Sequence, residues 1–206
     1  MIRDDIIFTM CHPESEIKIA QLRTLISAAK STSLPILLAS HLPLSSDIVS
    51  QVDYFIYDRY DTLSEGYIVN YYYNVPGYIS TCTRRPGGYH ALAGYISLKE
   101  SMTFLRNKFK RFHFISYDTL LDIKPYIEYV SSILLDYNFV SGRYDVPLQQ
   151  MKGILPGFFS CNIAWWDDHM PEISTWEEWK SHGRDGADNL LGENWLHNYF
   201  EDHWPI

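Results

Sequence analysis

The stretch IIFTMCHPESEIKIAQLRTLISAAKSTSLPILLASHLPLSSDIVSQVDYFIYD, residues 6–58, decides the fold of this chain. Three short apolar runs within it read as buried strands: Ile6–Met10, Ile36–Ser40 and Tyr54–Tyr57. Between the first two, apolar residues recur at helical spacing, which gives that segment one apolar face to lie on a sheet. Strands that alternate with helices are typical of βαβ units. The stretch therefore predicts an α/β fold with a mostly parallel central sheet flanked by helices.

The same alternation continues through most of the chain. Helices are predicted over residues 90–109, 125–137 and 193–200, and strands over residues 111–116 and 138–142. Residues 59–88 carry many tyrosines without a clean period, which predicts a long aromatic loop with one strand near Tyr78–Cys82. Residues 157–166 read as a strand or a hairpin. Because no repeat, linker or low-complexity tract interrupts the pattern, we expect a single domain over residues 1–206.

Two helix starts can be placed from capping chemistry. Pro13 suits the first turn of the first helix, where a missing N–H costs no hydrogen bond. Towards the C-terminus, a hydroxyl residue followed three positions later by glutamate is typical of a capping box. Two such pairs overlap there, Ser174 with Glu177 and Thr175 with Glu178, and both predict a helix over TWEEW.

Composition argues against several classes of protein. The chain has 206 residues, of which 46% are hydrophobic, and a formal net charge of -8. Lys and Arg that neutralise phosphates supply most sequence-independent affinity for nucleic acid, so this acidic balance argues against a nucleic-acid partner. Cys11, Cys82 and Cys161 are odd in number and lack the spacing of a zinc site or a disulfide framework. A reducing compartment fits this cysteine usage best.

The first residues do not resemble a targeting segment. MIRDDIIFTM lacks the charged region and the long apolar region of a signal peptide. No apolar stretch approaches the roughly 20 residues that a membrane helix needs. We therefore expect a soluble, cytoplasmic protein with no transmembrane segment, and the sequence does not indicate its oligomeric state.

Polar residues follow several of the predicted strands. In an open parallel α/β sheet, ligands bind outside the carboxyl ends of the strands. The residues at these ends are Thr9, His12, Asp58 and Asp118. The chain has no GxGxxG after its first strand, no Walker lysine motif and no GxSxG elbow. Dinucleotide oxidoreductases, P-loop NTPases and α/β-hydrolases are therefore disfavoured.

The order of these elements resembles a known family. Three strands that alternate with helices and end at Asp58, a basic glycine-containing loop RRPGG at residues 84–88, a helix, and a strand that ends at an acid resemble the layout of GT-A glycosyltransferases. The resemblance covers most of the chain and implies one GT-A-like, Rossmann-like domain that binds a nucleotide-diphospho-sugar donor. The family's Asp-x-Asp motif falls on Ser116-Tyr117-Asp118, where only the last acid is retained.

The resemblance also implies a division of roles at the donor site. Thr9, His12, Asp58 and Tyr117 would contact the donor together with Asp118. A divalent cation on the Asp118 carboxylate would neutralise the departing diphosphate as a Lewis acid. Oxygen ligands suit Mg²⁺ or Mn²⁺, and a histidine ligand, His203 with His197 as the next candidate, would favour Mn²⁺. Arg84 and Arg85 could donate hydrogen bonds to the phosphates.

An acceptor hydroxyl must lose its proton as it attacks, which calls for a carboxylate base. Gly192-Glu193-Asn194-Trp195 resembles the segment that supplies this base in inverting members of the family, so Glu193 is the predicted catalytic base. Asp167 and Asp168 are the substitutes. Aromatic rings are the surfaces on which sugars stack, and the predicted acceptor platform consists of Phe159, Trp165 and Trp166.

The leading hypothesis is metal-assisted transfer of a hexose or deoxyhexose from a UDP- or GDP-linked donor to a glycan acceptor, with inversion resting on Glu193. One alternative is a sugar-1-phosphate nucleotidyltransferase, but this class needs a glycine-rich basic loop directly after the first strand, and TMCHPES lacks it. Another is a non-catalytic module that binds carbohydrate or nucleotide on the same fold. Product formation that depends on a metal would separate it from the enzyme.

Overall fold

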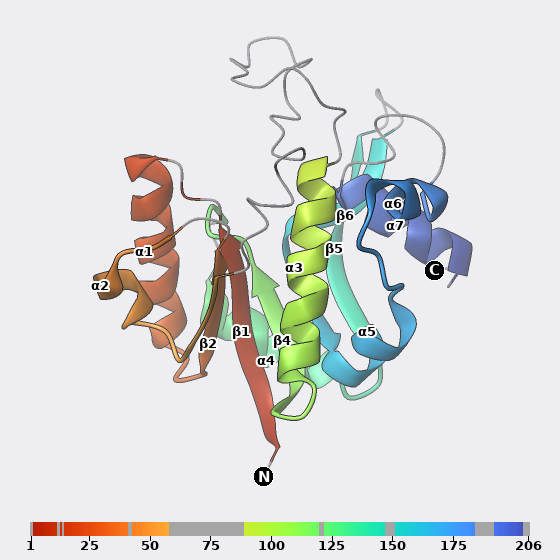
Figure 1. Ribbon diagram of the computed structural model, residues 1–206. Coiled ribbons are helices and arrows are strands. Elements are labelled where there is room, and N and C mark those ends of the chain that lie inside the picture. Colours follow the sequence, from red (N-terminus) through yellow and green to blue (C-terminus); the bar gives the residue numbers. More distant parts are fainter. Residues whose placement is uncertain are drawn as a thin grey trace. The chain divides into compact units, whose positions relative to one another are not determined.

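The computed structural model describes residues 2–11, 13, 15–40, 43–57, 89–119, 122–146, 151–183 and 192–203 (Figure 1). Its strands are β1 (Arg3–Cys11), β2 (Ile36–Ser40), β3 (Tyr54–Tyr57), β4 (Phe109–Ile115), β5 (Phe139–Val146) and β6 (Met151–Asn162). Its helices are α1 (Glu16–Lys30), α2 (Ser46–Val49), α3 (Tyr89–Leu105), α4 (Ile123–Ile133), α5 (Ile163–His169), α6 (Trp176–Ser181) and α7 (Gly192–His203). The predicted α/β class is confirmed, with a central sheet flanked by helices.

The sheet is mixed rather than mostly parallel. Its six strands lie in the order β3-β2-β1-β4-β6-β5. β3, β2, β1 and β4 are parallel to one another, as the βαβ pattern predicts. β6 is antiparallel to β4, with His113 opposite Ser160. The expectation of a mostly parallel sheet therefore holds for its first four strands only, because β6 inserts beside β4 in the opposite direction.

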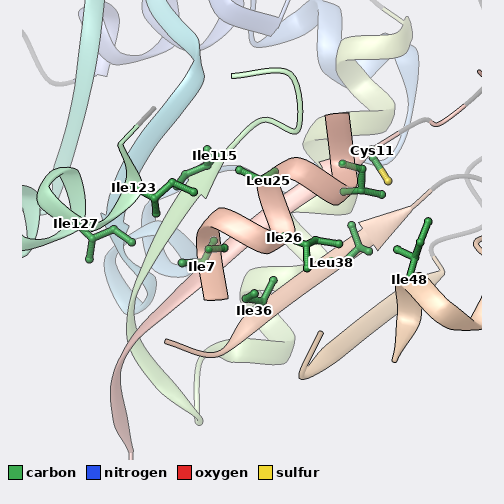
Figure 2. Close-up of a cluster of buried hydrophobic side chains, with 12 residues drawn as sticks. Ile7, Cys11, Leu25, Ile26, Ile36, Leu38, Ile48, Ile115, Ile123 and Ile127 are labelled. Carbon is green, nitrogen blue, oxygen red and sulfur yellow. The ribbon is translucent and has the colours of Figure 1, made fainter. Parts of the chain in front are cut away.

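One face of the parallel half is covered by α1 and α4. The buried cluster on this face includes Ile7 and Leu38 from the strands, Ile26 from α1 and Ile123 from α4 (Figure 2). The strand residues come from continuous apolar runs, in which alternate side chains face this cluster, and the helical residues lie on one side of their helices. The cluster fixes the two helices that follow β1 and β4.

The opposite face carries an aromatic core. Successive strand residues point to opposite faces, so Phe8 lies on the side away from Ile7. The ring of Phe8 lies 6.4 Å from that of Phe112, which in turn lies 5.8 Å from Trp166 of α5. Tyr54 of β3 contacts Phe104 of α3 with ring centroids 5.8 Å apart. Residues 98–105 of α3 and helix α5 therefore cover this face.

Some local predictions differ from the structure, among them the end of the helix predicted over residues 90–109, since α3 ends at Leu105 and β4 begins at Phe109. α1 begins at Glu16 rather than at Pro13, because Ser15 is its N-cap and accepts a hydrogen bond from the Lys18 N–H at 3.3 Å. Residues 157–166 are not one strand or hairpin, since β6 ends at Asn162 and α5 follows at once. The capping box is confirmed, and of the two overlapping pairs the structure forms the one between Thr175 and Glu178.

The chain forms two compact units that are interleaved along the sequence. The first contains residues 1–59, 98–142 and 157–170, and the second contains residues 60–97, 143–156 and 171–206. The expectation of a single domain stays a prediction. Across the described ranges, no helix combines the length and the apolar character needed to cross a membrane.

Candidate functional site

The carboxyl ends of the parallel strands lie together in the first unit. Cys11 at the end of β1 is the Cα partner of Ser40 at the end of β2, and Ser40 is the partner of Tyr57 at the end of β3. On the other side of β1, Phe8 is the partner of Phe114, one residue before β4 ends. The carboxyl ends of the four strands thus lie on the same side of the sheet, as the sequence predicts.

The strand order reverses between β1 and β4. From β1 the chain proceeds through β2 to β3 on one side, and it then returns to place β4 on the other side of β1. In open α/β sheets, the crevice outside the carboxyl ends at such a reversal is where ligands bind. Thr9 lies in β1, and Asp118 follows β4. The topology therefore favours a binding site between the loops that follow β1 and β4.

Asp118 lies in a tight turn directly after β4. The Thr119 N–H donates to the Ser116 carbonyl at 3.0 Å, which closes the turn, and the Ser116 hydroxyl donates to Oδ1 of Asp118. Tyr117 is half-buried and packs against the cluster beneath α1 and α4, whereas Asp118 is exposed. The Gly157 carbonyl of β6 accepts hydrogen bonds from the Ser116 N–H at 2.7 Å and from the Thr119 hydroxyl at 2.9 Å. The exposed carboxylate therefore stands on a turn that is fixed from both sides.

Thr9 is a buried polar residue near the end of β1. Its exposed fraction is 1%, and its hydroxyl has no hydrogen-bond partner among the residues that the structure describes. Most buried polar side-chain groups have a partner, and an exception calls for an explanation such as a water or a ligand. Thr9 was predicted to contact the donor; its hydroxyl lies near the strand reversal but is buried, so this role stays a prediction.

A buried chain of hydrogen bonds runs beneath α4. Arg111 donates to both carboxylate oxygens of Asp5, from Nε at 2.6 Å and from Nη2 at 2.9 Å. The same carboxylate lies 3.1 Å from Nε2 of His113, whose Nδ1 lies 2.9 Å from the hydroxyl of Ser160. The Tyr126 hydroxyl of α4 lies 3.0 Å from that of Ser160. We call these five residues the buried polar chain.

The order of partners in the buried polar chain fixes the directions of its hydrogen bonds when His113 is neutral. An ionised carboxylate only accepts hydrogen bonds, so a neutral His113 carries its proton on Nε2 and accepts from Ser160 on Nδ1. Ser160 then accepts from Tyr126. Burial raises the pKa of Asp5, but hydrogen bonds from His113 and Arg111 outweigh burial, so that the pKa lies below its ordinary value. Burial also raises the pKa of Tyr126, which keeps its phenol protonated at neutral pH.

The buried polar chain was not predicted from the sequence. His113 and Ser160 are fully buried, so no substrate reaches them in this arrangement. The one available signal is the alternation in RFHFI, which places Arg111 and His113 on the same face of a strand. Their partner Asp5 is more than 100 positions away, and only the register between β1 and β4 brings it opposite Arg111.

Several predicted site residues lie outside the described residues: His12, Asp58, Arg84 and Arg85. The same holds for the side chains of Glu193 and His197, although both residues belong to α7. His203 ends α7 in the second unit and is exposed. Its Nδ1 lies 2.9 Å from the Tyr199 carbonyl, and its ring centroid lies 4.1 Å from that of Tyr199.

The substitute bases and the acceptor platform do not join Asp118. α5 follows Asn162, which is the partner of Arg111 near the amino end of β4. Asp167 and Asp168 therefore lie at the amino ends of the parallel strands, whereas Asp118 lies at their carboxyl ends. There Arg106 forms ion pairs with both acids. Pairing with this arginine accounts for the two acids without a catalytic role.

The predicted platform residues serve mainly in packing. Phe159 and Trp166 are buried in the aromatic core with ring centroids 5.8 Å apart, so their faces are covered by protein. Trp165 is half-buried and stacks on His169 at 5.1 Å. Since all of them lie in β6 or α5, the structure places aromatic packing where the sequence suggested a sugar surface.

Among the residues that the structure describes, the candidate site offers a metal ion one carboxylate, that of Asp118. Within the described part of the chain, no three His, Cys, Asp or Glu side chains are grouped to hold a metal. Mg²⁺-like ions in nucleotide sites need only one or two protein carboxylates, because substrate phosphates and waters complete their coordination. Among the described residues, Asp118 receives a hydrogen bond on Oδ1 from Ser116 and none on Oδ2. Asp118 therefore fits an ion that arrives with a diphosphate.

Comparisons with known proteins do not assign the chain to a group. No protein-family model matches the sequence, and no curated protein matches it. The interpretation of the site therefore rests on its geometry.

Proposed function

We propose that the protein is a glycosyltransferase that binds a UDP- or GDP-linked sugar at the carboxyl ends of β1 and β4 and transfers the sugar to a glycan acceptor. The observation that carries the proposal is the exposed Asp118 on a fixed turn at the point where the strand order reverses. This is where an open α/β sheet binds nucleotides. The buried hydroxyl of Thr9 at the neighbouring strand adds a polar group without a described partner.

Asp118 has the central role in this proposal. Its carboxylate would hold a Mg²⁺ or Mn²⁺ ion that arrives with the diphosphate, and the ion would neutralise the leaving group when bound. Ser116 keeps the Asp118 side chain in place through its hydrogen bond to Oδ1. Arg84, Arg85, His12 and Asp58 remain proposed donor contacts.

The proposed catalytic base for the acceptor hydroxyl belongs to α7. Glu193 lies in the first turn of this helix and remains the proposed base that takes the acceptor proton. His203 remains a proposed metal ligand. Asp167 and Asp168 are not part of the proposal, because their ion pairs with Arg106 lie at the amino ends of the parallel strands.

The first experiment measures thermal unfolding of the purified protein with UDP, GDP, CMP and their sugars, with and without Mn²⁺. A ligand at about 100 times its Kd stabilises the native state by about 2.7 kcal/mol, which raises the Tm of a chain of this size by about 5–10 °C. We expect such a metal-dependent rise for one nucleotide in the wild type and none in Asp118→Ala. Asp136→Ala is the matched control, because Asp136 is exposed and follows α4.

Two further results distinguish the alternatives. Release of the free nucleoside diphosphate together with transfer of the sugar would support the glycosyltransferase. Release of pyrophosphate from a nucleoside triphosphate and a sugar-1-phosphate would indicate a nucleotidyltransferase instead. Binding without either product would indicate a binding module. If no nucleotide raises the Tm of the wild type, the proposed function is wrong.

A further inference from the structure

Strand β6 approaches the Asp118 turn unusually closely at Gly157. We infer that Gly157 and Thr119 are positioning residues that set the direction of the Asp118 carboxylate. This inference rests on the proposed function, since it concerns how the same site holds its ligand. Neither residue needs to touch the ligand, because both would act through the turn.

Two hydrogen bonds join the turn to β6. The Gly157 carbonyl accepts from the Ser116 N–H at 2.7 Å and from the Thr119 hydroxyl at 2.9 Å. Ser116 lies two residues before Asp118 and Thr119 one residue after it. The attachment points therefore flank Asp118, and a shift of either one moves its carboxylate.

The contact leaves no room for a side chain at position 157. A Cβ built on Gly157 would lie 2.6 Å from Oγ1 of Thr119, closer than real Cβ contacts, and 3.6 Å from its Cγ2. The backbone of Gly157 is not in the left-handed region, so the requirement for glycine comes from space alone. The Thr119 hydroxyl cannot simply rotate away, because rotation would break its bond to the Gly157 carbonyl and because χ1 of threonine is restricted.

The strand cannot easily yield either. Phe158 and Phe159 are in register with Ile115 and Phe114 of β4. The ring of Phe158 also contacts that of Tyr126 at 5.1 Å, and Phe159 is buried in the aromatic core. Since packed side chains hold β6 on both faces of the sheet, a Cβ at position 157 would displace the turn rather than the strand.

A displaced turn has a measurable consequence for the ligand. Partners that orient a metal-binding carboxylate typically change metal affinity by about 10- to 100-fold when they are mutated. We therefore expect Gly157→Ala to weaken binding of Mn²⁺ in the presence of UDP or GDP by about tenfold or more. The overall fold should persist, because the substitution adds a single methyl group beside the turn that follows β4.

The experiment is a double-mutant cycle with four proteins: wild type, Gly157→Ala, Thr119→Ala and the double variant. The probes are Mn²⁺ with UDP and Mn²⁺ with GDP, and the readout is free Mn²⁺ measured by electron paramagnetic resonance. Thr119→Ala removes the atom that the new methyl group meets. If the contact is the cause, Gly157→Ala should weaken binding by no more than about twofold in the Thr119→Ala background.

Two control variants distinguish an effect on the direction of the Asp118 carboxylate from a general loss of folded structure. Thr119→Ser keeps the hydroxyl and should bind within about twofold of wild type. Thr24→Ala removes an exposed threonine hydroxyl on α1 that bonds the Ala20 carbonyl, and it should leave binding unchanged. Urea unfolding of every variant checks that each is folded under the conditions of the binding assay.

The outcomes distinguish this inference from the proposed function. If the wild type binds Mn²⁺ with neither nucleotide, the proposed function is wrong and the inference falls with it. If the wild type binds and Gly157→Ala binds equally well, only the inference is wrong. Equal losses from Gly157→Ala in both backgrounds would also overturn it, because they would show that Thr119 is not the residue displaced.

Discussion

Replacing Asp5 by asparagine tests the buried polar chain. Asp5 accepts two hydrogen bonds from Arg111 and lies within hydrogen-bond distance of His113, and the side chains of Asp5 and Arg111 are only 14% and 15% exposed. Asp5→Asn keeps the shape of the side chain but removes its charge and one acceptor. The guanidinium of Arg111 is then left partly buried without an anion.

The expected loss of stability can be worked from these contacts. Breaking a fully buried ion pair by removing one partner costs about 3–5 kcal/mol, because it leaves an uncompensated charge. Asp5 and Arg111 keep some exposure, so we expect a loss near the lower end, about 3 kcal/mol. Asp4→Asn is a matched control in the same strand: Asp4 pairs with Lys110 at 2.7 Å, but both side chains are more than 60% exposed. Its loss should stay below about 1 kcal/mol.

The loss in Asp5→Asn should depend on pH in a defined direction. The pKa of Asp5 is lowered in the folded protein, so its ionised form stabilises the fold fully above the unfolded value of about 3.9. That contribution disappears as the pH falls through the lower folded value. The difference in free energy of unfolding between wild type and Asp5→Asn should therefore shrink as the pH falls below about pH 4.

Urea unfolding followed by circular dichroism at a series of pH values measures both quantities. The reasoning would be refuted if Asp5→Asn lost no more stability than Asp4→Asn at pH 7. A deficit that stayed constant below pH 4 would also contradict it, because the lost interaction would then not involve the ionised carboxylate.

Two smaller losses are expected elsewhere. Tyr126→Phe removes the hydroxyl that meets Ser160 and should cost about 1 kcal/mol in urea unfolding, and no loss would show that this end of the buried polar chain is not coupled to stability. Thr175→Ala removes the capping box of α6 and should cost about 1 kcal/mol, with faster hydrogen exchange at the Glu178 amide. Unchanged exchange there would argue against the cap.

The parallel half of the fold could be predicted because its signals are local. The runs at residues 36–40 and 54–57 coincide with β2 and β3, since short apolar segments bounded by polar residues are typical of buried strands. The place of β6 could not be predicted in this way. Its pairing with β4 depends on contacts between Phe159 and Phe114 that lie far apart in the sequence, and no period within either strand indicates the partner.

The candidate site shows the same division. The position of Asp118 follows from a strand end, which the sequence reveals. The role of Gly157 does not, because a glycine in a strand has many possible reasons and only the structure shows Thr119 beside it. Composition likewise shows that aromatic rings are present at positions 165 and 166 but not which ring faces are covered, and only the structure shows that Trp166 is fully buried.

The strand order also bears on how the chain folds as it leaves the ribosome. β5 is synthesised before β6, yet β6 lies between β5 and β4 in the finished sheet. Until residue 162 of the 206 has been made, β6 is incomplete and the edge of β4 that it will pair with stays unpaired, although β5 has already been synthesised. Open edges are templates for pairing, and nascent domains with exposed edges are prone to misassembly. Direct pairing of β5 with β4 is therefore the folding error that this topology invites.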